Sequence, residues 1–156
     1  SLDDTRFVSN NDGWEQPMTD IVTAHDYSAY ESDLRSEDYK DPAVFNFGVP
    51  NKAKAVTADG YNNLGKPCLL TEYGGIAFTK DSGNGNWGYN GAVTDEKVFI
   101  ERFDSITTAF KNTPFLCGYC YTQLTDVFQE VNGLLDMDRN PKVSIDEIRR
   151  INLKRK

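Results

Sequence analysis

The chain has 156 residues, the length of one domain, and it can bury an ordinary hydrophobic core. Its formal net charge is −7 and its only basic cluster is the last three residues, so nucleic acid is not expected as a partner. No apolar run approaches the roughly 20 residues of a membrane helix, so no membrane partner is expected either. Residues 1–2 are interpreted as a cloning remnant and residues 3–156 as the domain, while the compartment stays open.

Two strands and one helix are expected in the first part of the chain. Short apolar runs predict strands at residues 6–9 and 20–24, and each run is followed by polar and aromatic residues. Residues 31–66 are interrupted by proline and glycine, and within them only residues 52–58 are predicted to be helical.

The second part of the chain predicts two further strands, at residues 68–71 and 115–120. Residues 79–94 are rich in glycine and asparagine, which indicates a mobile loop between these strands.

Two helices are predicted after this loop. Residues 95–111 carry one apolar stripe, with Thr94 as the expected N-cap. Ser144 and Glu147 form a capping box that predicts a last helix. The stripe of the first helix consists of Phe99, Phe103, Ile106 and Phe110.

The alternation of strands and helices predicts an α/β fold with parallel strands and crossover helices. Four such units make half of an eight-stranded (β/α)8 barrel. A half barrel leaves two unpaired sheet edges and an uncovered inner face. We therefore also expect self-association, in which two copies pair their open edges.

The sequence contains three cysteines and one histidine, residue types that can ligate a metal or, for cysteine, carry redox chemistry. Cys117 and Cys120 match the C-x-x-C pattern of zinc and redox sites. The apolar and aromatic residues around them favour a strand, in which residues three apart face opposite sides. We therefore expect these two and Cys68 to be reduced side chains of the core. His25 has no second ligand pair near it in the sequence, so neither a metal nor a cofactor is expected.

Glu72 is the most informative residue, because it follows a short buried strand and precedes two glycines. In a parallel α/β fold, catalytic groups gather at the C-terminal ends of the strands. A charged residue at this position is either a buried, paired structural acid or a reacting group. The local pattern alone leaves both readings open.

Groups suited to a sugar follow every predicted strand. Glu72 could attack an anomeric carbon, and Tyr27 could hold its carboxylate ionised and oriented. Aromatic rings with convergent polar groups are the expected chemistry of a saccharide cleft, although a single ring at a strand end can equally pack the fold. The remaining candidates for substrate binding are Asn11, Asp12, Trp14, His25, Asp26, Trp87, Tyr121 and Gln123.

The segment at residues 70–75, Leu-Thr-Glu-Tyr-Gly-Gly, resembles the nucleophile motif of glycoside hydrolase family 2, the β-galactosidase and β-glucuronidase family. Four further segments resemble barrel strands five, six and eight and the closing segment of bacterial members, in the family's order: residues 11–15, 20–28, 119–126 and 132–142. This resemblance implies the C-terminal half of a catalytic barrel, with Glu72 as nucleophile and Tyr27 as the tyrosine that contacts it.

The chain departs from the family in one respect that concerns the mechanism. Family members carry an upstream Asn-Glu motif whose glutamate is the general acid/base, and no Asn-Glu pair occurs in this sequence. Glu15 is interpreted as a rim or structural acid, because nothing places it at the roughly 5–5.5 Å from Glu72 that a retaining mechanism requires. The resemblance therefore implies a piece of a retaining β-glycosidase that is inactive by itself.

Two other functions stay open at this point. One is a non-catalytic carbohydrate-binding module that retains barrel motifs, and the other is a barrel hydrolase of a different family. The sugar, whether a β-galactoside, β-glucuronide or β-mannoside, is not determined by the sequence.

Overall fold

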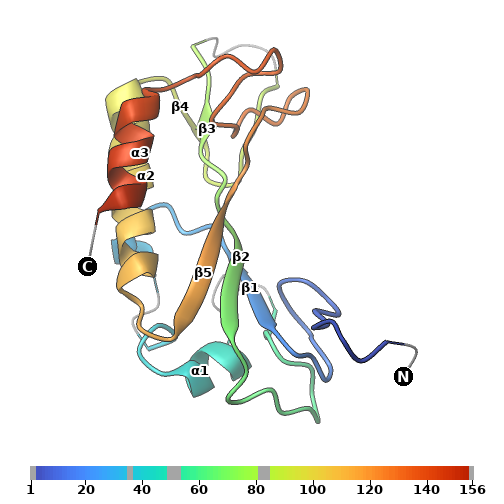
Figure 1. Cartoon of the computed structure of the whole chain (residues 1–156). Helices are drawn as coiled ribbons and strands as arrows, with labels where there is room; N and C mark the ends of the chain where they lie inside the picture. Colours follow the sequence, from blue (N-terminus) through green and yellow to red (C-terminus); the bar gives the residue numbers. More distant parts are fainter. Residues whose placement is uncertain (1–2, 35–36, 49–53, 81–84, 155–156) are drawn as a thin grey trace. The chain divides into compact units, whose positions relative to one another are not determined.

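The computed structural model describes residues 3–34, 37–48, 54–80 and 85–154 (Figure 1). The chain divides into two compact units. The first consists of residues 1–26, 34–72 and 113–120, and the second of residues 27–33, 73–112 and 121–156.

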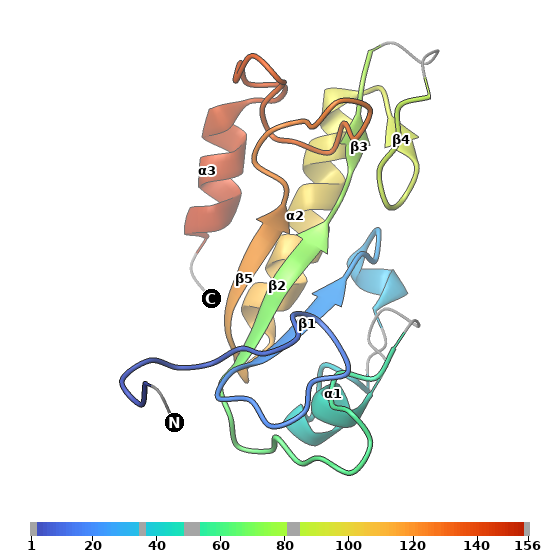
Figure 2. The same ribbon diagram turned by 90° about the vertical axis from the view of Figure 1, so that its right-hand side faces the viewer.

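A three-stranded sheet runs through the first unit. Its strands lie in the order β1 (Val22–Asp26), β2 (Cys68–Gly74) and β5 (Leu116–Thr122), and all three point the same way (Figures 1 and 2). The last two residues of β2 and of β5 are assigned to the second unit. The predicted α/β fold with parallel strands is thus confirmed, and each strand ends further along the chain than predicted.

Strand β1 is buried along its whole length, and a side-chain amide bonds to its backbone. Gln16 is fully buried, and its Nε2 atom donates to the Thr23 carbonyl at 2.5 Å. The backbone N–H of Thr23 donates in return to Gln16 Oε1 at 3.1 Å. This amide satisfies backbone groups that a further strand would otherwise have to pair. The core of this unit consists of Val22, Ala24, Phe45, Val56, Cys68 and Leu70.

Helix α1 (Pro42–Phe47) lies in the same unit, in a stretch where the sequence predicted no helix. Asp41 is its N-cap, and the Asp41 side chain accepts a hydrogen bond from the Ala43 N–H at 2.7 Å. Phe45 anchors the helix, since its ring is fully buried and lies 5.3 Å from that of Phe115. A six-residue helix is too short to show an apolar stripe, so only its cap marked it in the sequence.

The strand predicted at residues 6–9 is wrong, because these residues are irregular. Phe7 is 83% exposed, so the apolar run does not enter the core. The Val8 carbonyl accepts instead from the backbone N–H of Asp20 at 2.8 Å. A short apolar run becomes a strand only where a neighbouring strand pairs with it, and none does here among the described residues.

The helix predicted at residues 52–58 is also wrong where the structure describes it. Residues 52–53 lie outside the described residues, and residues 54–58 are not helical. Thr57 forms a parallel bridge with Gln16, and the Ala58 N–H donates to the Gln16 carbonyl at 2.9 Å. Tertiary pairing therefore overrides the local preference of this segment.

The cysteines are free thiols in two different environments. Cys68 is buried, as predicted, whereas Cys117 and Cys120 are exposed, which corrects the prediction that all three fill the core. The two exposed thiols lie on β5, which is an edge strand of the sheet formed by the described residues. Burial, and next the nearby Cys117 thiol, raise the pKa of Cys68 to about 11.

The second unit is built around two helices, α2 (Glu96–Asn112) and α3 (Ile145–Leu153). Two short parallel strands, β3 (Ala77–Phe78) and β4 (Ala92–Val93), and a 3-10 turn, η1 (Glu31–Asp33), complete it (Figure 1). Its core cluster consists of Ile76, Phe78, Phe99, Phe103, Val143 and Ile151. All four residues of the apolar stripe predicted for the long helix are buried, which confirms that prediction.

Helix α2 begins one residue later than predicted, and α3 begins directly after its predicted cap. The cap of α2 is Asp95 and not Thr94, because the Asp95 carboxylate accepts from the Lys97 N–H at 2.7 Å. A carboxylate at this position also interacts favourably with the positive end of the helix dipole. The capping box of α3 is confirmed in part, since Ser144 Oγ accepts from the Glu147 N–H at 3.3 Å.

A buried ion pair fixes the segment that follows β5. Lys142 Nζ donates to both carboxylate oxygens of Asp126, at 2.7 and 2.8 Å, and to the Val131 carbonyl at 2.7 Å. Asp126 also accepts from the Gly133 N–H at 2.8 Å. The two charged side chains are only 11% and 9% exposed, so each depends on the other for compensation of its charge.

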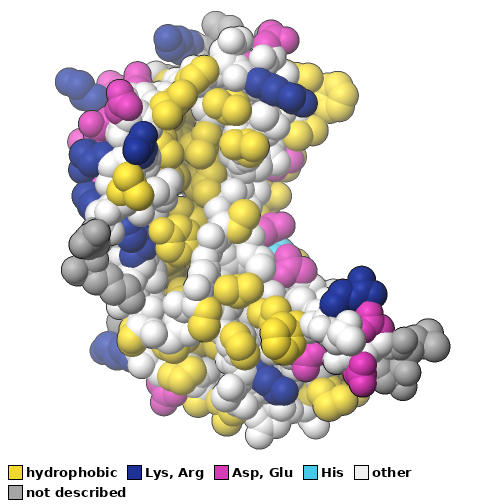
Figure 3. All heavy atoms as spheres, in the orientation of Figure 1, with side chains coloured by type: hydrophobic (Ala, Val, Ile, Leu, Met, Phe, Trp, Pro, Cys, Tyr) yellow, Lys and Arg dark blue, Asp and Glu magenta, His cyan; other side chains and the backbone are white. Residues whose placement is uncertain are grey.

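The strands of the described residues do not close into a barrel, and the expected half barrel is not confirmed. No described helix combines the length and the apolar character needed to cross a membrane. On the face shown in Figure 3, Lys and Arg side chains are scattered among acidic ones.

Candidate active site

Three titratable side chains of the first unit meet near the ends of β1 and β2. His25 lies in β1, Glu72 in β2, and Asp12 in the loop that precedes β1. His25 Nε2 lies 3.0 Å from Asp12 Oδ2, and His25 Nδ1 lies 3.2 Å from Glu72 Oε2. The sequence names all three as candidates, but it gives no reason to pair them. We refer to them as the Asp12–His25–Glu72 cluster.

The imidazole of this cluster is buried and the two carboxylates are not. The His25 side chain is 8% exposed, against 51% for Asp12 and 36% for Glu72. The ring is therefore held by protein on most sides, while both acids can meet a ligand from solvent. A buried base between two accessible acids is typical of a site that handles protons or charge.

Asp12 is held from two strands. Thr71, next to Glu72 on β2, donates its hydroxyl to Asp12 Oδ1 at 2.7 Å, while His25 on β1 contacts Oδ2. Partial burial is the largest influence on the pKa of Asp12 and raises it. The hydrogen bonds from His25, Thr71 and Thr23 outweigh that effect and lower the pKa below its ordinary value. Asp12 is thus an ionised anchor beside the ring.

The loop that carries Asp12 folds tightly over the imidazole. Gly13 has φ +91°, and its N–H donates to Thr23 Oγ1 at 2.9 Å. A Cβ atom on Gly13 would lie 2.7 Å from three atoms of the His25 ring, so only glycine fits. Trp14 then packs edge-on against His25, with ring centroids 4.8 Å apart.

The cluster also has the composition of a metal site. One imidazole nitrogen and two carboxylate oxygens, all within 4.8 Å of one another, are ligand types that a divalent transition metal accepts. The sequence predicted no metal site at His25, because no other ligand pair lies near it along the chain. The fold supplies two acids that lie far from it along the chain.

Three other acids and amides near these strands have different surroundings. Asp26 is fully buried and accepts from the Tyr39 hydroxyl at 2.7 Å. Burial and then Asp26 raise the pKa of Tyr39 well above its ordinary value. Asn11 is exposed, and its side chain donates to the Trp14 carbonyl at 2.6 Å. Glu15 forms an exposed ion pair with Lys54 at 2.9 Å, in keeping with a rim acid.

The second unit contains a cluster of three aromatic rings. Tyr27 stacks on Tyr89 with centroids 3.9 Å apart, and Trp87 meets Tyr89 edge-on at 5.6 Å. Gly75 makes this possible, because a Cβ there would lie 2.5 Å from Tyr89 and 2.9 Å from Tyr27. Trp87 and Tyr89 are nearly half exposed, at 47% and 46%. Tyr89 was missed by sequence reasoning, and its only signal was the aromatic content of the glycine-rich loop.

Tyr121 and Gln123 also belong to the second unit, at and after the end of β5. The Tyr121 ring lies edge-on to Tyr73 and Phe103, and its hydroxyl donates to the Asn132 carbonyl at 3.2 Å. Burial raises the pKa of this phenol. Gln123 Nε2 is buried and lacks a hydrogen-bond partner among the described residues.

The predicted site residues therefore fall into two groups, one in each unit, and only the first contains a cluster of titratable groups. A contact between Tyr27 and Glu72 stays a prediction. The first group consists of Asn11, Asp12, Trp14, His25, Asp26 and Glu72, and the second of Tyr27, Trp87, Tyr121 and Gln123.

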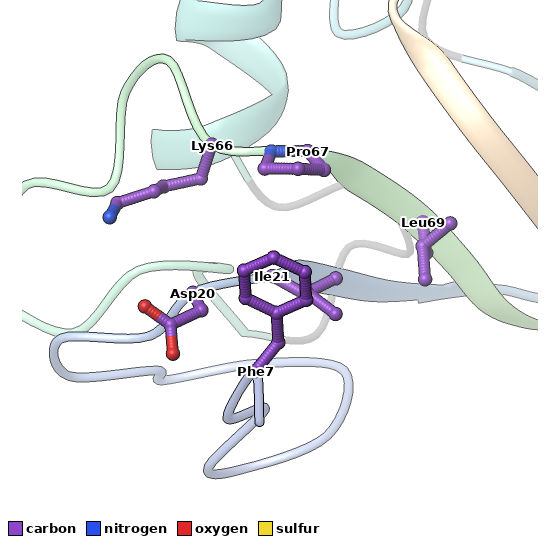
Figure 4. Close-up of a pocket in the computed structure, with 6 residues that line it drawn as sticks. All are labelled: Phe7, Asp20, Ile21, Lys66, Pro67 and Leu69. Carbon is purple, nitrogen blue, oxygen red and sulfur yellow. The ribbon is translucent and has the colours of Figure 1, made fainter. Parts of the chain in front are cut away.

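The first unit also contains a shallow cavity of about 430 Å³ at the opposite ends of β1 and β2. Ile21 and Pro67, which precede these strands, line it together with Phe7 and Leu69 (Figure 4). Asp20 and Lys66 place opposite charges on its rim. The cavity contains no predicted site residue.

Comparison with known proteins supports the fold. No protein-family model matches the chain, and no curated protein does. Among solved structures, an agarase, AgWH50C, matches with a TM-score of 0.57 and 15% identity over 86% of this chain. A β-glucuronidase from Bifidobacterium dentium, complexed with coumarin-3-O-glucuronide, matches with a TM-score of 0.50 and 19% identity over 88% of the chain.

These two proteins are glycoside hydrolases, and the chain spans 18% and 21% of their lengths. The chain therefore shares the fold of one part of such enzymes. At these identities the likeness establishes the fold and not the activity.

Proposed function

We propose that the chain is part of the catalytic domain of a retaining β-glycosidase and that Glu72 is its nucleophile. The observation that carries this proposal is the Asp12–His25–Glu72 cluster, which places a solvent-accessible carboxylate beside a buried imidazole at the end of a parallel strand. The shared fold with part of an agarase and of a β-glucuronidase supports it. The motif at residues 70–75 extends the proposal to glycoside hydrolase family 2, of the β-galactosidase type.

In the proposed mechanism, Glu72 attacks the anomeric carbon of a β-glycoside and forms a glycosyl ester. The bond to the leaving oxygen breaks as an acid/base glutamate, supplied by another part of the protein, protonates that oxygen. The same glutamate then takes a proton from water, whose oxygen attacks the anomeric carbon and releases Glu72 as a carboxylate. Without that second carboxyl group, the isolated chain is inactive.

Each unit, taken by itself, offers aromatic rings or polar groups that suit a saccharide. Trp87 and Tyr89 offer half-exposed faces of the kind on which a pyranose ring stacks. Trp14 borders the cluster directly through its contact with His25. Asn11 and Gln123 are candidates for binding hydroxyl groups.

Two experiments on a longer protein that contains this chain test the nucleophile. Glu72→Gln should lower turnover of aryl β-glycosides about a thousand-fold or more, whereas Glu15→Gln, a matched change at an exposed acid, should not. A 2-deoxy-2-fluoro glycoside should trap a covalent adduct on the peptide that carries Glu72. Turnover close to normal in Glu72→Gln, or an adduct on another residue, would refute the assignment.

A second candidate function is a carbohydrate-binding module without catalysis, which the half-exposed Trp87 and Tyr89 favour. It requires saturable binding of a saccharide that is lost in Trp87→Ala and unchanged in Glu72→Gln. The adduct experiment separates the two functions, because a binding module forms no covalent ester. Self-association through open sheet edges stays a prediction that light scattering can test.

A further inference from the structure

We propose that Asp12 is a positioning residue that acts on Glu72 through His25, so that the three side chains form a carboxylate–imidazole–carboxylate relay. This inference rests on the proposed function, because it says how the nucleophile of that site is held. Asp12 would touch no reacting atom. Its part is to fix the ring that in turn fixes the Glu72 carboxylate.

The two sides of the imidazole carry the argument. Each ring nitrogen lies at hydrogen-bond distance from a different carboxylate, 3.0 Å on the Asp12 side and 3.2 Å on the Glu72 side. A neutral imidazole has one N–H and can donate to only one of them, whereas an imidazolium donates to both. In a neutral ring, the acid that accepts the single N–H therefore leaves a bare nitrogen facing the other acid.

The groups around the relay leave the ring little freedom. Trp14 packs against one edge of the imidazole, and the Gly13 backbone approaches it too closely for any side chain. Thr71 holds the second oxygen of Asp12 at 2.7 Å. Because Thr71 and Glu72 are neighbours on β2, the strand that presents the nucleophile also fixes the far end of the relay.

The geometry favours hydrogen bonds over a shared cation. A metal ion bound to one ring nitrogen would lie beside the carboxylate on that side of the ring. The other carboxylate would still contact the second ring nitrogen. In that arrangement the second acid would orient the imidazole and not ligate the ion. A metal site is therefore the alternative that the experiment must separate from the relay.

His25 is the only histidine, so one imidazole signal reports on the whole relay. Long-range ¹H–¹⁵N NMR of ¹⁵N-histidine-labelled protein distinguishes a protonated ring nitrogen from a bare one. In Asp12→Asn, the neutral ring should carry its proton on Nδ1, because charged Glu72 is then the stronger acceptor. In Glu72→Gln, the neutral ring should carry its proton on Nε2, which faces Asp12. Glu15→Gln is the control and should leave the spectrum unchanged.

The Asp12→Asn result is decisive, because a free histidine side chain favours the Nε2–H tautomer. Finding Nε2–H in that variant would show that His25 does not donate to Glu72 and would overturn the relay. One-to-one binding of Zn²⁺ to the wild-type protein, lost in both Asp12→Asn and Glu72→Gln, would also overturn it in favour of a metal site. If Asp12→Asn does not fold, Thr71→Val should broaden or shift the imidazole signals without removing a charge, and an unchanged spectrum would count against the relay.

Kinetics of the longer protein complete the test. Asp12→Asn should lower kcat roughly tenfold to hundredfold with little change in KM, as for other carboxylates that orient a functional imidazole. An unchanged kcat together with the Nδ1–H tautomer would overturn the proposal, because Asp12 would then have no effect on the position of the Glu72 carboxylate. Full activity in Glu72→Gln would refute the proposed function and leave the tautomer result standing, so the two failures are distinguishable.

Discussion

The tight loop over His25 predicts a specific sensitivity at Gly13. In Gly13→Ala, the new methyl group would lie 2.7 Å from three atoms of the imidazole. The ring would have to retreat by about 0.7 Å to reach the 3.4 Å of ordinary contact. It has little room to do so, because it is buried and Trp14 packs on it.

Gly60 is a control that separates the steric clash with His25 from the cost of placing alanine at a positive φ. Gly60, in the same unit, has φ +81°, and a Cβ there would meet nothing within 4 Å. Alanine in the left-handed region costs about 1–2 kcal/mol at either position, partly offset by about 0.4–1 kcal/mol from a less flexible unfolded chain. Gly13→Ala adds overpacking of about 1–3 kcal/mol, which Gly60→Ala lacks.

Thermal and urea unfolding, followed by circular dichroism, measure the difference between the two variants. Gly13→Ala should melt about 2–12 °C below Gly60→Ala, at roughly 2–4 °C per kcal/mol for a chain of this size. It should also disturb the imidazole signals of His25, and Gly60→Ala should not. If the two variants unfold within about 0.5 kcal/mol of each other, the packing of the loop on His25 is refuted.

Two further predictions concern the buried ion pair and the thiols. Asp126→Asn should lower the free energy of unfolding, measured in urea, by about 3–5 kcal/mol, because it leaves the Lys142 charge buried without compensation. The control Asp138→Asn, at an exposed acid, should stay within about 0.5 kcal/mol of wild type. A loss below 1 kcal/mol would show that Lys142 reaches water. Ellman's reagent at neutral pH should react quickly with the two exposed thiols, Cys117 and Cys120. It should react with Cys68 only on unfolding, because burial and the nearby Cys117 thiol raise the pKa of Cys68 to about 11. Three fast thiols would contradict the burial of Cys68.

Local patterns were reliable where the physics is local. The apolar stripe of α2 and the capping box of α3 depend on residues three and four apart, so both could be predicted. The run before Glu72 likewise predicted β2, because a buried parallel strand is apolar throughout. Helix α1 was missed because six residues show no stripe.

Predictions failed where a short segment depended on a distant partner. Residues 6–9 have the composition of a strand, but no strand of the described residues pairs with them, and Phe7 lies on the surface. Residues 54–58 have helix-forming residues, yet Thr57 pairs with Gln16. In both cases the competing interaction is tertiary and leaves no trace in the local pattern.

By itself, the sequence predicted a buried strand next to Glu72 and residue types suited to a sugar near the ends of the other strands. It could not determine what Glu72 meets. His25 and Asp12 reach it only because β1 pairs beside β2 and because Gly13 lets the preceding loop fold over the ring. Strand adjacency and loop closure depend on the packing of the whole unit, and that packing turned three separate candidates into one cluster.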